Sequence, residues 1–527
     1  MKISVIDLGF NSAKLVNYYV EKERFYTAYS QEGVTVRLGE GLDESGFLSK
    51  ASICRTINAL KLFQDIINFE SVEHVLAVAT SAVREATNKE DFLAEVYRKT
   101  GIRLRVLSGK EESLYSYGGA IKNICLPTTL FFDLGGGSLE MVYSENFKIK
   151  KVISLPLGAL RLSDIYSDDG NFKSFKKNYS RLEQHILQEL PDRKELDLSP
   201  DSALVGVGGT LRAMSRYDQD LQHYILDKIH NYRIDFESVD LISKKLYKMT
   251  TGEIAKIDAV GNNRAETITA GSCIIKMLMQ KLEFNEIIVS AQGLREGILL
   301  SFLESPRQYY KENITQNKIQ NYVRINCELG ASSKLSRGLL LPLISNRIIK
   351  KKEHLILNLA KIQMSKIPVT TSLYNLFYMI IDEDIPYLTH GEQLILALSI
   401  VHTKKPKIAN WLFKRYESIL WSQNRRSIEK ISACLVMLSI LERNKCNIKL
   451  TFYNEKRIIV AIMLDNDNNI KFPEMLFSNA IKKFETAFNI IVDFSISYKS
   501  NQMTSAMRRV LHRQKPNSSI VSINKRV

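Results

Sequence analysis

A glycine-rich turn between two apolar runs stands out in the sequence from Phe131 to Tyr143, FFDLGGGSLEMVY. An apolar run ending in Asp133, three glycines with Ser138, and a second alternating run predict a strand, a tight turn and an antiparallel strand. Glycines let the backbone approach a ligand closely, and successive N–H groups in such a turn form a nest for phosphate oxygens. At the end of the first strand, the Asp133 carboxylate can hold a Mg2+ ion on that phosphate. A glycine-rich hairpin without a ligand is an equal alternative if the pattern occurs once.

The pattern occurs a second time, near the N-terminus, where Val5 to Val16 reads VIDLGFNSAKLV. Aligning Asp7 with Asp133, at an offset of 126 residues, also matches the following leucine and glycine, the serine of the turn and a valine of the second strand. Two copies at a domain-sized separation predict two similar domains that face each other. Each domain is expected to offer one phosphate loop to a common cleft.

Three further segments are expected to open helices. The segment Ser202 to Arg212, SALVGVGGTLR, predicts a strand running into a helix at Gly208–Thr210, where backbone amides can receive an anion. Thr80-Ser81 is expected to cap a helix that bears Arg84. Ser108–Glu112 opens another helix with two adjacent acids, which are usually solvated and favourable to the helix dipole.

The chain of 527 residues has a formal net charge of +16, and its distribution is uneven. Residues 301–527 hold 35 Lys and Arg against 17 Asp and Glu, a net charge of +18, which leaves −2 for residues 1–300. A basic half beside a near-neutral half indicates a polyanionic partner, although a genome that favours lysine is an alternative source of the excess. Because no apolar run approaches the roughly 20 residues of a membrane span and no signal peptide precedes the first strand, we expect a cytoplasmic protein without a membrane span.

The periodicity along the chain predicts five parts. Residues 1–122 and 123–305 follow the same α/β plan, and residues 306–445 have helical periodicity. Residues 446–500 are expected to form a small α/β unit, in which Asn447 to Leu464 and Ala487 to Tyr498 read as strands. Residues 501–527 are predicted to be a basic tail.

These segments together resemble the exopolyphosphatase / guanosine pentaphosphate phosphohydrolase (Ppx/GppA) family, of the actin, Hsp70 and sugar-kinase superfold. The two turns resemble the phosphate loops of that family, and ATSAVREA, LSGKEES, VGVGGTLRA and GLREGIL resemble its intervening segments in the same order. The resemblance covers roughly residues 1–305. It implies the fold class α/β, with two ribonuclease-H-like (actin-like ATPase) domains followed by a helical HD-like domain and a small C-terminal α/β unit.

Two departures from the family pattern are visible. Phe10 occupies the position of a serine in the first loop, so a hydroxyl is lost while the backbone N–H is kept. The helices after residue 306 lack the His/Asp pattern of HD-type relatives, and His390 is expected to stand at a helix start rather than to bind a metal. The HD-like domain is therefore predicted to be degenerate.

The resemblance assigns roles to residues of the two α/β domains. It implies that Glu112 is the catalytic base and that Arg84 grips phosphate. The residues themselves suggest Mg2+ between Asp7 and Asp133, with Glu140 on metal-bound water or, as an equal alternative, on the surface. For Arg37 and Arg295 two roles are left open, contact with the substrate or a salt bridge. The predicted phosphate-binding residues are Gly9, Asn11, Ser12, Gly135, Gly136, Gly137, Ser138, Gly208, Gly209 and Thr210.

The expected function is that of an exopolyphosphatase that releases orthophosphate from inorganic polyphosphate with Mg2+, the basic half guiding the polymer. One alternative is a guanosine pentaphosphate 5′-phosphohydrolase (pppGpp to ppGpp) of the stringent response. Another is an inactive nucleotide- or nucleic-acid-binding protein. The resemblance also implies a homodimer, and no specific nucleic acid is expected as a partner.

Overall fold

The computed structural model describes residues 1–22, 25–168, 174–306, 334–366, 371–385, 387–443, 447–454, 456–464, 473–498 and 508–509. The chain divides into two compact units. Unit 1 consists of Met1–Leu329 with Asp384–Thr389, and unit 2 of Gly330–Glu383 with His390–Val527.

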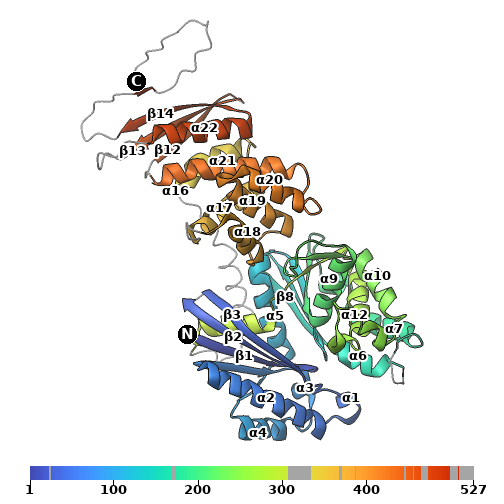
Figure 1. Cartoon of the computed structure of the whole chain (residues 1–527). Helices are drawn as coiled ribbons and strands as arrows, with labels where there is room; N and C mark the ends of the chain where they lie inside the picture. Colours follow the sequence, from blue (N-terminus) through green and yellow to red (C-terminus); the bar gives the residue numbers. More distant parts are fainter. Residues whose placement is uncertain are drawn as a thin grey trace. The chain divides into compact units, whose positions relative to one another are not determined.

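The first sheet of unit 1 has the strand order β3-β2-β1-β4-β5 (Figure 1). Strands β1 (Lys2–Leu8), β2 (Ser12–Lys22) and β3 (Phe25–Thr35) form an antiparallel meander, and β4 (His74–Ala79) and β5 (Arg105–Val106) continue it in parallel with β1. Its helices are α1 (Leu42–Ser45), α2 (Lys50–Glu70), α3 (Ser81–Glu85) and α4 (Lys89–Thr100).

The second sheet repeats this arrangement with one additional strand, in the order β10-β11-β9-β6-β7-β8. Its antiparallel meander is β6 (Thr129–Leu134), β7 (Leu139–Glu145) and β8 (Lys148–Leu155), and β9 (Ala203–Gly208) and β11 (Glu286–Val289) run parallel to β6. The added strand is β10 (Arg233–Asp235). Unit 1 therefore has an actin-like, two-domain architecture.

Most helices of the second domain surround the buried helix α12 (Ile268–Lys281) (Figure 1). Apolar residues of α12 such as Ile274 and Leu278 are fully buried in the same core as Leu130 of β6, so they hold the sheet against the helical layer. The other helices are α6 (Ala159–Tyr166), α7 (Tyr179–Glu189), α8 (Arg193–Leu196), α9 (Gly209–Leu221), α10 (Phe236–Leu246), α11 (Thr251–Ile254) and the short 3-10 helix η1 (Asn262–Arg264).

Two helices pack backbone against backbone between the sheets, α5 (Gly109–Ile124) and α13 (Leu294–Glu304). A Cβ atom on Gly119 would lie 2.0 Å from the carbonyl oxygen of Gly293, and one on Gly297 would lie 1.9 Å from that of Tyr115. Only glycine permits so close an approach. The core around these helices includes Val5 of β1 and Phe131 of β6, so it joins both domains.

Unit 2 begins with helices and ends with a small sheet. The helices are α16 (Lys334–Ser345), α17 (Lys351–Lys366), α18 (Leu373–Asp382), α19 (His390–Lys404), α20 (Pro406–Arg415) and α21 (Asn424–Arg443). The sheet has the order β12-β13-β14-β15, formed by β12 (Asn447–Asn454), β13 (Arg457–Leu464), β14 (Ile491–Tyr498) and β15 (Arg508–Arg509), with α22 (Glu474–Phe488) before β14.

The strand predicted at Ala487 to Tyr498 is wrong at its start. Helix α22 continues to Phe488 and ends at Asn489, whose φ of 56° is left-handed, and β14 starts only at Ile491. The buried residues Phe484 and Phe488 lie four positions apart, the helical spacing of one face. His390 begins α19 and is buried. The predicted basic tail lies outside the described residues, apart from β15.

None of the helices in the described ranges is long and apolar enough to cross a membrane.

Candidate active site

The two glycine turns have the same internal geometry and touch each other. The Gly9 amide donates to the Ser12 carbonyl at 3.0 Å, and the Gly135 amide donates to the Ser138 carbonyl at 3.0 Å. A Cβ atom on Gly136 would lie 3.3 Å from the Cβ of Asn11. The turns, 126 residues apart in sequence, therefore meet at one place in unit 1.

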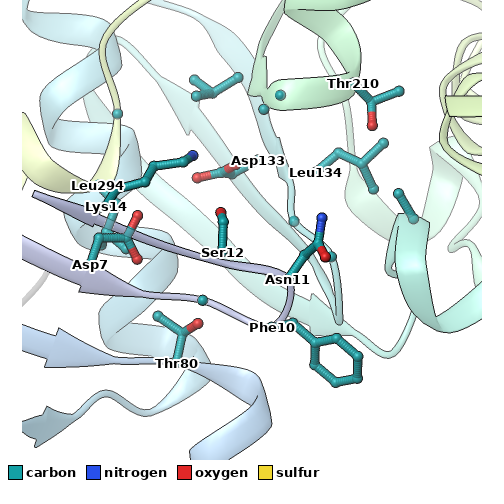
Figure 2. Close-up of a pocket in the computed structure, with 18 of the residues that line it drawn as sticks. Asp7, Phe10, Asn11, Ser12, Lys14, Thr80, Asp133, Leu134, Thr210 and Leu294 are labelled. Atoms are coloured by element: carbon teal, nitrogen blue, oxygen red, sulfur yellow. The ribbon is translucent and has the colours of Figure 1, made fainter. Parts of the chain in front are cut away.

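Both turns line one cavity of about 280 Å3 (Figure 2). The start of α9 and the start of α13 line it as well. Figure 2 shows Asp7, Ser12 and Asp133 grouped around this space. Arg84, Gly137 and Glu140 are not among the lining residues. The predicted site residues that do line the cavity are Asp7, Gly9, Asn11, Ser12, Glu112, Asp133, Gly135, Gly136, Ser138, Gly208, Gly209 and Thr210.

The adjacent acids Glu111 and Glu112 have different surroundings. Glu111 closes a capping box at the start of α5, because its carboxylate accepts from the Ser108 amide at 3.0 Å and its own amide donates to the Ser108 hydroxyl. It also pairs with Arg105 at 2.7 Å. Glu112 lines the cavity, so the helix start fixes which of the two acids can meet a ligand.

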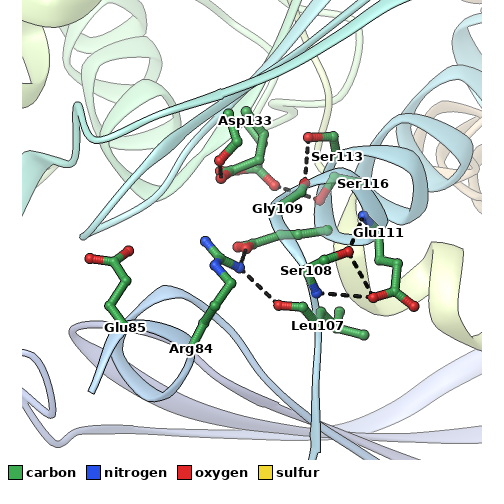
Figure 3. A network of polar contacts seen from close by, with 12 residues as sticks. Arg84, Glu85, Leu107, Ser108, Gly109, Glu111, Ser113, Ser116 and Asp133 are labelled. Atoms are coloured by element: carbon green, nitrogen blue, oxygen red, sulfur yellow. Dashed lines mark hydrogen bonds and ion pairs between the residues drawn. The ribbon is translucent and has the colours of Figure 1, made fainter. Parts of the chain in front are cut away.

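Glu112 is held by Arg84, which Figure 3 shows beside Leu107. Nη1 of Arg84 donates to Oε2 of Glu112 at 2.8 Å and to the carbonyl of Leu107 at 3.0 Å. Burial raises the pKa of Glu112 to about 7, Arg84 opposes this rise, and the charges of Asp133 and Asp7 add to it. A carboxyl group with a pKa near 7 is suited to general acid–base catalysis.

Asp133 and Glu140 face each other across β6 and β7. They are directly paired in the antiparallel register, which places their side chains on the same face. The Ser116 hydroxyl donates to Asp133 at 2.7 Å, and the Ser154 hydroxyl donates to Glu140 at 3.0 Å (Figure 3 shows Ser116 with Asp133). Burial and neighbouring carboxylates raise the pKa of both groups.

The carboxylates of Asp7 and Asp133 are suited to a metal ion that takes few protein ligands. Within the described ranges, no three His, Cys, Asp or Glu side chains lie close enough to form a complete metal site. Mg2+ usually keeps several waters and takes one or two carboxylates plus substrate phosphates, so it does not need such a cluster. Asp7 and Asp133 line the cavity, and the charges of both raise the pKa of Glu112. A divalent cation beside them would relieve this repulsion.

Four partly buried cations also line the cavity, three of them without a role predicted from the sequence. They are Lys14, Arg212, Arg264 and Arg295, of which only Arg295 was a candidate. Within the part of the chain that the structure describes, none of the four has an acidic partner within 4.0 Å. Burial, with nearby arginines, lowers the pKa of Lys14 to about 8 and that of Arg212 to about 10. Cations that are held partly out of water without an ion-pair partner attract anions, so the cavity is suited to a polyanion.

The internal sequence repeat indicates that Lys14 belongs to the site. Lys14 pairs with Asp7 across β1 and β2 as Glu140 pairs with Asp133 across β6 and β7. Lys14 and Glu140 are themselves 126 residues apart, so they occupy equivalent positions in the two domains. Arg212 follows the predicted phosphate-binding Thr210 in the first turn of α9, whereas tertiary packing alone brings Arg264 to the cavity.

At the start of α9 the backbone of Gly208 and Gly209 lines the cavity, because neither residue has a side chain to cover it. Gly208 has a φ of 128°, which side-chain-bearing residues rarely adopt. A Cβ atom on Gly209 would lie 2.0 Å from Nη1 of Arg264, so the guanidinium rests on the helix start. A helix N-terminus and an arginine are thereby placed together, an arrangement that favours anions.

The aromatic ring of Phe10 is almost fully buried. It is 2% exposed, and Cβ atoms added to Gly39 and Gly137 would each lie 2.3 Å from it. The Arg161 guanidinium lies 5.4 Å from the ring centroid and pairs with Asp43 at 3.3 Å. Figure 2 shows the ring pointing away from Asp7 and Asp133. Because the Gly9–Ser12 hydrogen bond is kept, Phe10 preserves the turn that the serine-containing relatives are expected to have.

Arg37 bridges the two domains at the surface. Its Nη2 lies 2.9 Å from Glu266, and its Nη1 lies 3.8 Å from Glu40. Of the two alternatives left open for this residue, the structure shows the salt bridge.

Two actin-like domains with paired glycine turns, an acid and partly buried cations at one cavity are typical of proteins that bind phosphorylated ligands. The Ppx/GppA phosphatase family matches residues 19–306, more than half of the chain, and the protein belongs to this family.

The relatives extend the comparison over the same region. Exopolyphosphatase 1 of Mycobacterium tuberculosis is 28% identical over 315 residues, which is 58% of this chain and 89% of that protein. A bifunctional 3-dehydroquinate synthase/phosphatase of Fusobacterium nucleatum is 29% identical over 314 residues, and the chain spans only 46% of its length. An exopolyphosphatase structure from Cytophaga hutchinsonii has a TM-score of 0.53 at 24% identity and covers 58% of this chain and 98% of its own, which shows a shared fold.

Proposed function

We propose that the protein is an exopolyphosphatase that hydrolyses the terminal phosphoanhydride bond of inorganic polyphosphate and releases orthophosphate. One observation carries the proposal. Glu112, with a pKa of about 7, opens onto the same cavity as the two glycine turns and four partly buried cations. Two exopolyphosphatases of Mycobacterium tuberculosis are similar to more than half of the chain, at 28% and 27% identity.

In this proposal Glu112 is the general base. Its carboxylate takes a proton from a water molecule whose oxygen bonds to the terminal phosphorus, while the bond from phosphorus to the bridging oxygen breaks. The shortened polyphosphate leaves with the electron pair of that bond. Arg84 orients the carboxylate through the 2.8 Å hydrogen bond and favours its ionised form.

Backbone amides of the two turns and of the α9 start would hold the terminal phosphoryl group. These turns have no side-chain bulk at Gly9, Gly135 and Gly136, so donors can approach phosphate oxygens. Ser12, Ser138 and Thr210 add hydroxyl donors at the same cavity. The cations Lys14, Arg212 and Arg264 would bind the phosphates behind the terminal one.

Asp7 and Asp133 would hold Mg2+, which supplies neutralisation of the phosphoryl oxygens when bound. Glu140, which pairs with Asp133 across β6 and β7, is a proposed partner of metal-bound water. The proposal also includes a cytoplasmic location, a homodimer and a degenerate HD-like domain. It places the domain boundaries at residues 122, 305, 445 and 500.

Polyphosphate suits the cavity better than a guanine nucleotide. Among the described residues that line it, Phe10 is the only aromatic one, and its buried ring presents no face for a base to stack on. The four cations offer charge along a linear polyanion.

The test compares phosphate release from long-chain polyphosphate, guanosine pentaphosphate and ATP in the presence of Mg2+. We expect the highest kcat/KM on polyphosphate, and Arg212→Met should reduce it for polyphosphate more than for ATP. A higher kcat/KM on guanosine pentaphosphate would support the stringent-response phosphohydrolase instead. No release from any of the three would support a binding protein without catalysis.

A further inference from the structure

Unit 2 has an exposed face that combines aromatic rings with uncompensated positive charge. Helix α20 presents Lys407, Asn410, Trp411, Lys414 and Arg415 to solvent, at the spacing that places them on one side of a helix. The opposite side of α20, which includes Leu412 and Phe413, is buried. The exposed side is therefore a defined surface, and we call it the α20 face.

The start of α21 packs beside α20 at Phe413, and we include its exposed residues in the α20 face. The Arg425 guanidinium lies 5.0 Å from the ring centroid of Phe413, which places the first turn of α21 beside α20. The Trp421 amide donates to the Asn424 side chain at 2.7 Å, and the Asn424 amide donates to the Trp421 carbonyl at 2.8 Å. These bonds fix the backbone of Trp421 directly before Arg425 and Arg426.

Both tryptophans of the chain lie here and are exposed. Trp411 is 53% exposed and Trp421 is 73% exposed. Tyr374 of α18, 44% exposed, makes an edge-to-face contact with Trp411 at 6.1 Å between ring centroids. A tryptophan is usually buried or at an interface, so two exposed indoles indicate a ligand.

Positive charge predominates in the segment that forms this face. Between residues 404 and 426 there are seven Lys and Arg and a single acid, Glu417, and all seven cations are exposed. Within the described ranges none of them has an acidic partner within 4.0 Å. The cations are Lys404, Lys405, Lys407, Lys414, Arg415, Arg425 and Arg426.

We propose that the α20 face binds single-stranded nucleic acid without sequence preference. Proteins of this kind combine a basic track for the phosphate backbone with aromatic side chains on which bases stack, and both components are present. This site is separate from the cavity of unit 1 and does not depend on the function proposed for it.

The aromatic residues distinguish this ligand from other partners of a basic surface. Inorganic polyphosphate has no planar group to meet Trp411 or Trp421. A membrane-surface helix buries its apolar side in lipid, whereas the apolar side of α20 is already covered by unit 2. A symmetric contact with a second copy would bring two sets of seven cations together, which like-charge repulsion disfavours.

The test uses the full-length protein and its intrinsic fluorescence, since both tryptophans report from the α20 face. The probe is an oligouridylate of about 12 nucleotides, within the range of known single-strand sites. We expect saturable quenching, because bases stack on the indoles, and weaker binding at higher salt. A duplex of the same length should quench much less, since its bases are already stacked.

Two variants separate stacking from charge. Trp411→Leu should weaken binding about tenfold, as expected for the loss of one stacked base. Lys414→Glu with Arg415→Glu keeps both tryptophans and should weaken binding strongly while making the salt dependence shallower by about 1.4 in log–log slope. Lys50→Glu with Lys61→Glu, two exposed positions on α2, makes the same charge change and should leave binding unchanged.

Several results would overturn the proposal. They are no quenching by the oligonucleotide, equal quenching by inorganic polyphosphate at the same phosphate concentration, or equal weakening by the α2 control. A blue shift with phosphatidylserine vesicles and no response to oligouridylate would assign the face to a membrane surface. A fluorescence change on dilution that Lys414→Glu with Arg415→Glu abolishes would assign it to self-association.

Discussion

Arg84 and Glu112 form an ion pair at the wall of the cavity, with Nη1 of Arg84 2.8 Å from Oε2 of Glu112. The arginine lowers the pKa of a carboxyl group that burial and the neighbouring Asp133 and Asp7 raise. The balance leaves this pKa at about 7, so the acid can be both buried and ionised near neutral pH.

Replacement of Arg84 should disturb this balance. In Arg84→Gln the favourable charge is lost while burial remains, so the pKa of Glu112 should rise. We expect the acidic limb of the pH profile of kcat/KM to move to higher pH, and turnover at pH 7 to fall by about tenfold or more. The control is Arg98→Gln on α4, which is exposed and is not among the residues that line the cavity. An unmoved acidic limb in Arg84→Gln would show that the pair does not set the ionisation of Glu112.

The whole pH profile should have two limbs. Glu112 must lose its proton to act as a base, so kcat/KM on polyphosphate should rise through about pH 7. Lys14 loses its positive charge as pH rises through its lowered pKa of about 8, so kcat/KM should decline above that value.

Lys14→Arg tests the assignment of the alkaline limb. Arginine keeps its charge at all accessible pH values, so the decline above about pH 8 should disappear in this variant. The measurement is initial phosphate release at polyphosphate concentrations well below KM. A decline that persists unchanged would assign this limb to another group.

Phe10 should matter for stability more than for phosphate binding. Phe10→Ser introduces the hydroxyl of the family pattern but removes a ring packed against Gly39 and Gly137. The loss should cost about 3 kcal/mol of unfolding free energy, measured by denaturant titration. Phe69→Ser is the matched control, because its ring is 87% exposed and should cost less than about 0.5 kcal/mol. Equal losses in the two variants would refute the packing role.

Asp133 should contribute to metal binding. We expect a chelator to abolish phosphate release and Mg2+ to restore it. By calorimetry without substrate, Asp133→Asn should bind Mg2+ at least about tenfold more weakly, because a carboxylate is the preferred protein ligand of this ion. Asp65→Asn, an exposed position on α2, should bind Mg2+ as the unmodified protein does. Equal Mg2+ affinity in the two variants would remove Asp133 from the metal site.

The sequence was sufficient to predict the paired domains, because their signals are local. Strand, Asp, glycine turn and strand are contiguous, so one motif seen twice defines both hairpins and the expectation that they meet. The choice of Glu112 over Glu111 came from the family resemblance. Its physical reason, the capping box of Glu111, became visible only in the structure.

Other parts depend on tertiary packing and were missed. Arg212 and Arg264 reach the cavity from α9 and η1, and no sequence pattern connects these segments. The start of β14 was predicted too early. Phe484 and Phe488 have the spacing of one face of a helix, and the prediction did not take this spacing into account. The packing of the Phe10 ring against Gly39 and Gly137 also depends on tertiary contacts that the sequence does not indicate.

The central claim is that Glu112 supplies the base in a cavity that holds the end of polyphosphate. The most direct measurement is the single-turnover rate of phosphate release, with polyphosphate binding measured separately, for Glu112→Gln and Glu111→Gln. Glutamine is also found in capping boxes, so Glu111→Gln should keep the helix start and near-normal turnover. We predict that Glu112→Gln lowers the rate by about 10²–10⁴-fold while polyphosphate still binds. A Glu112→Gln rate equal to that of Glu111→Gln would contradict the account.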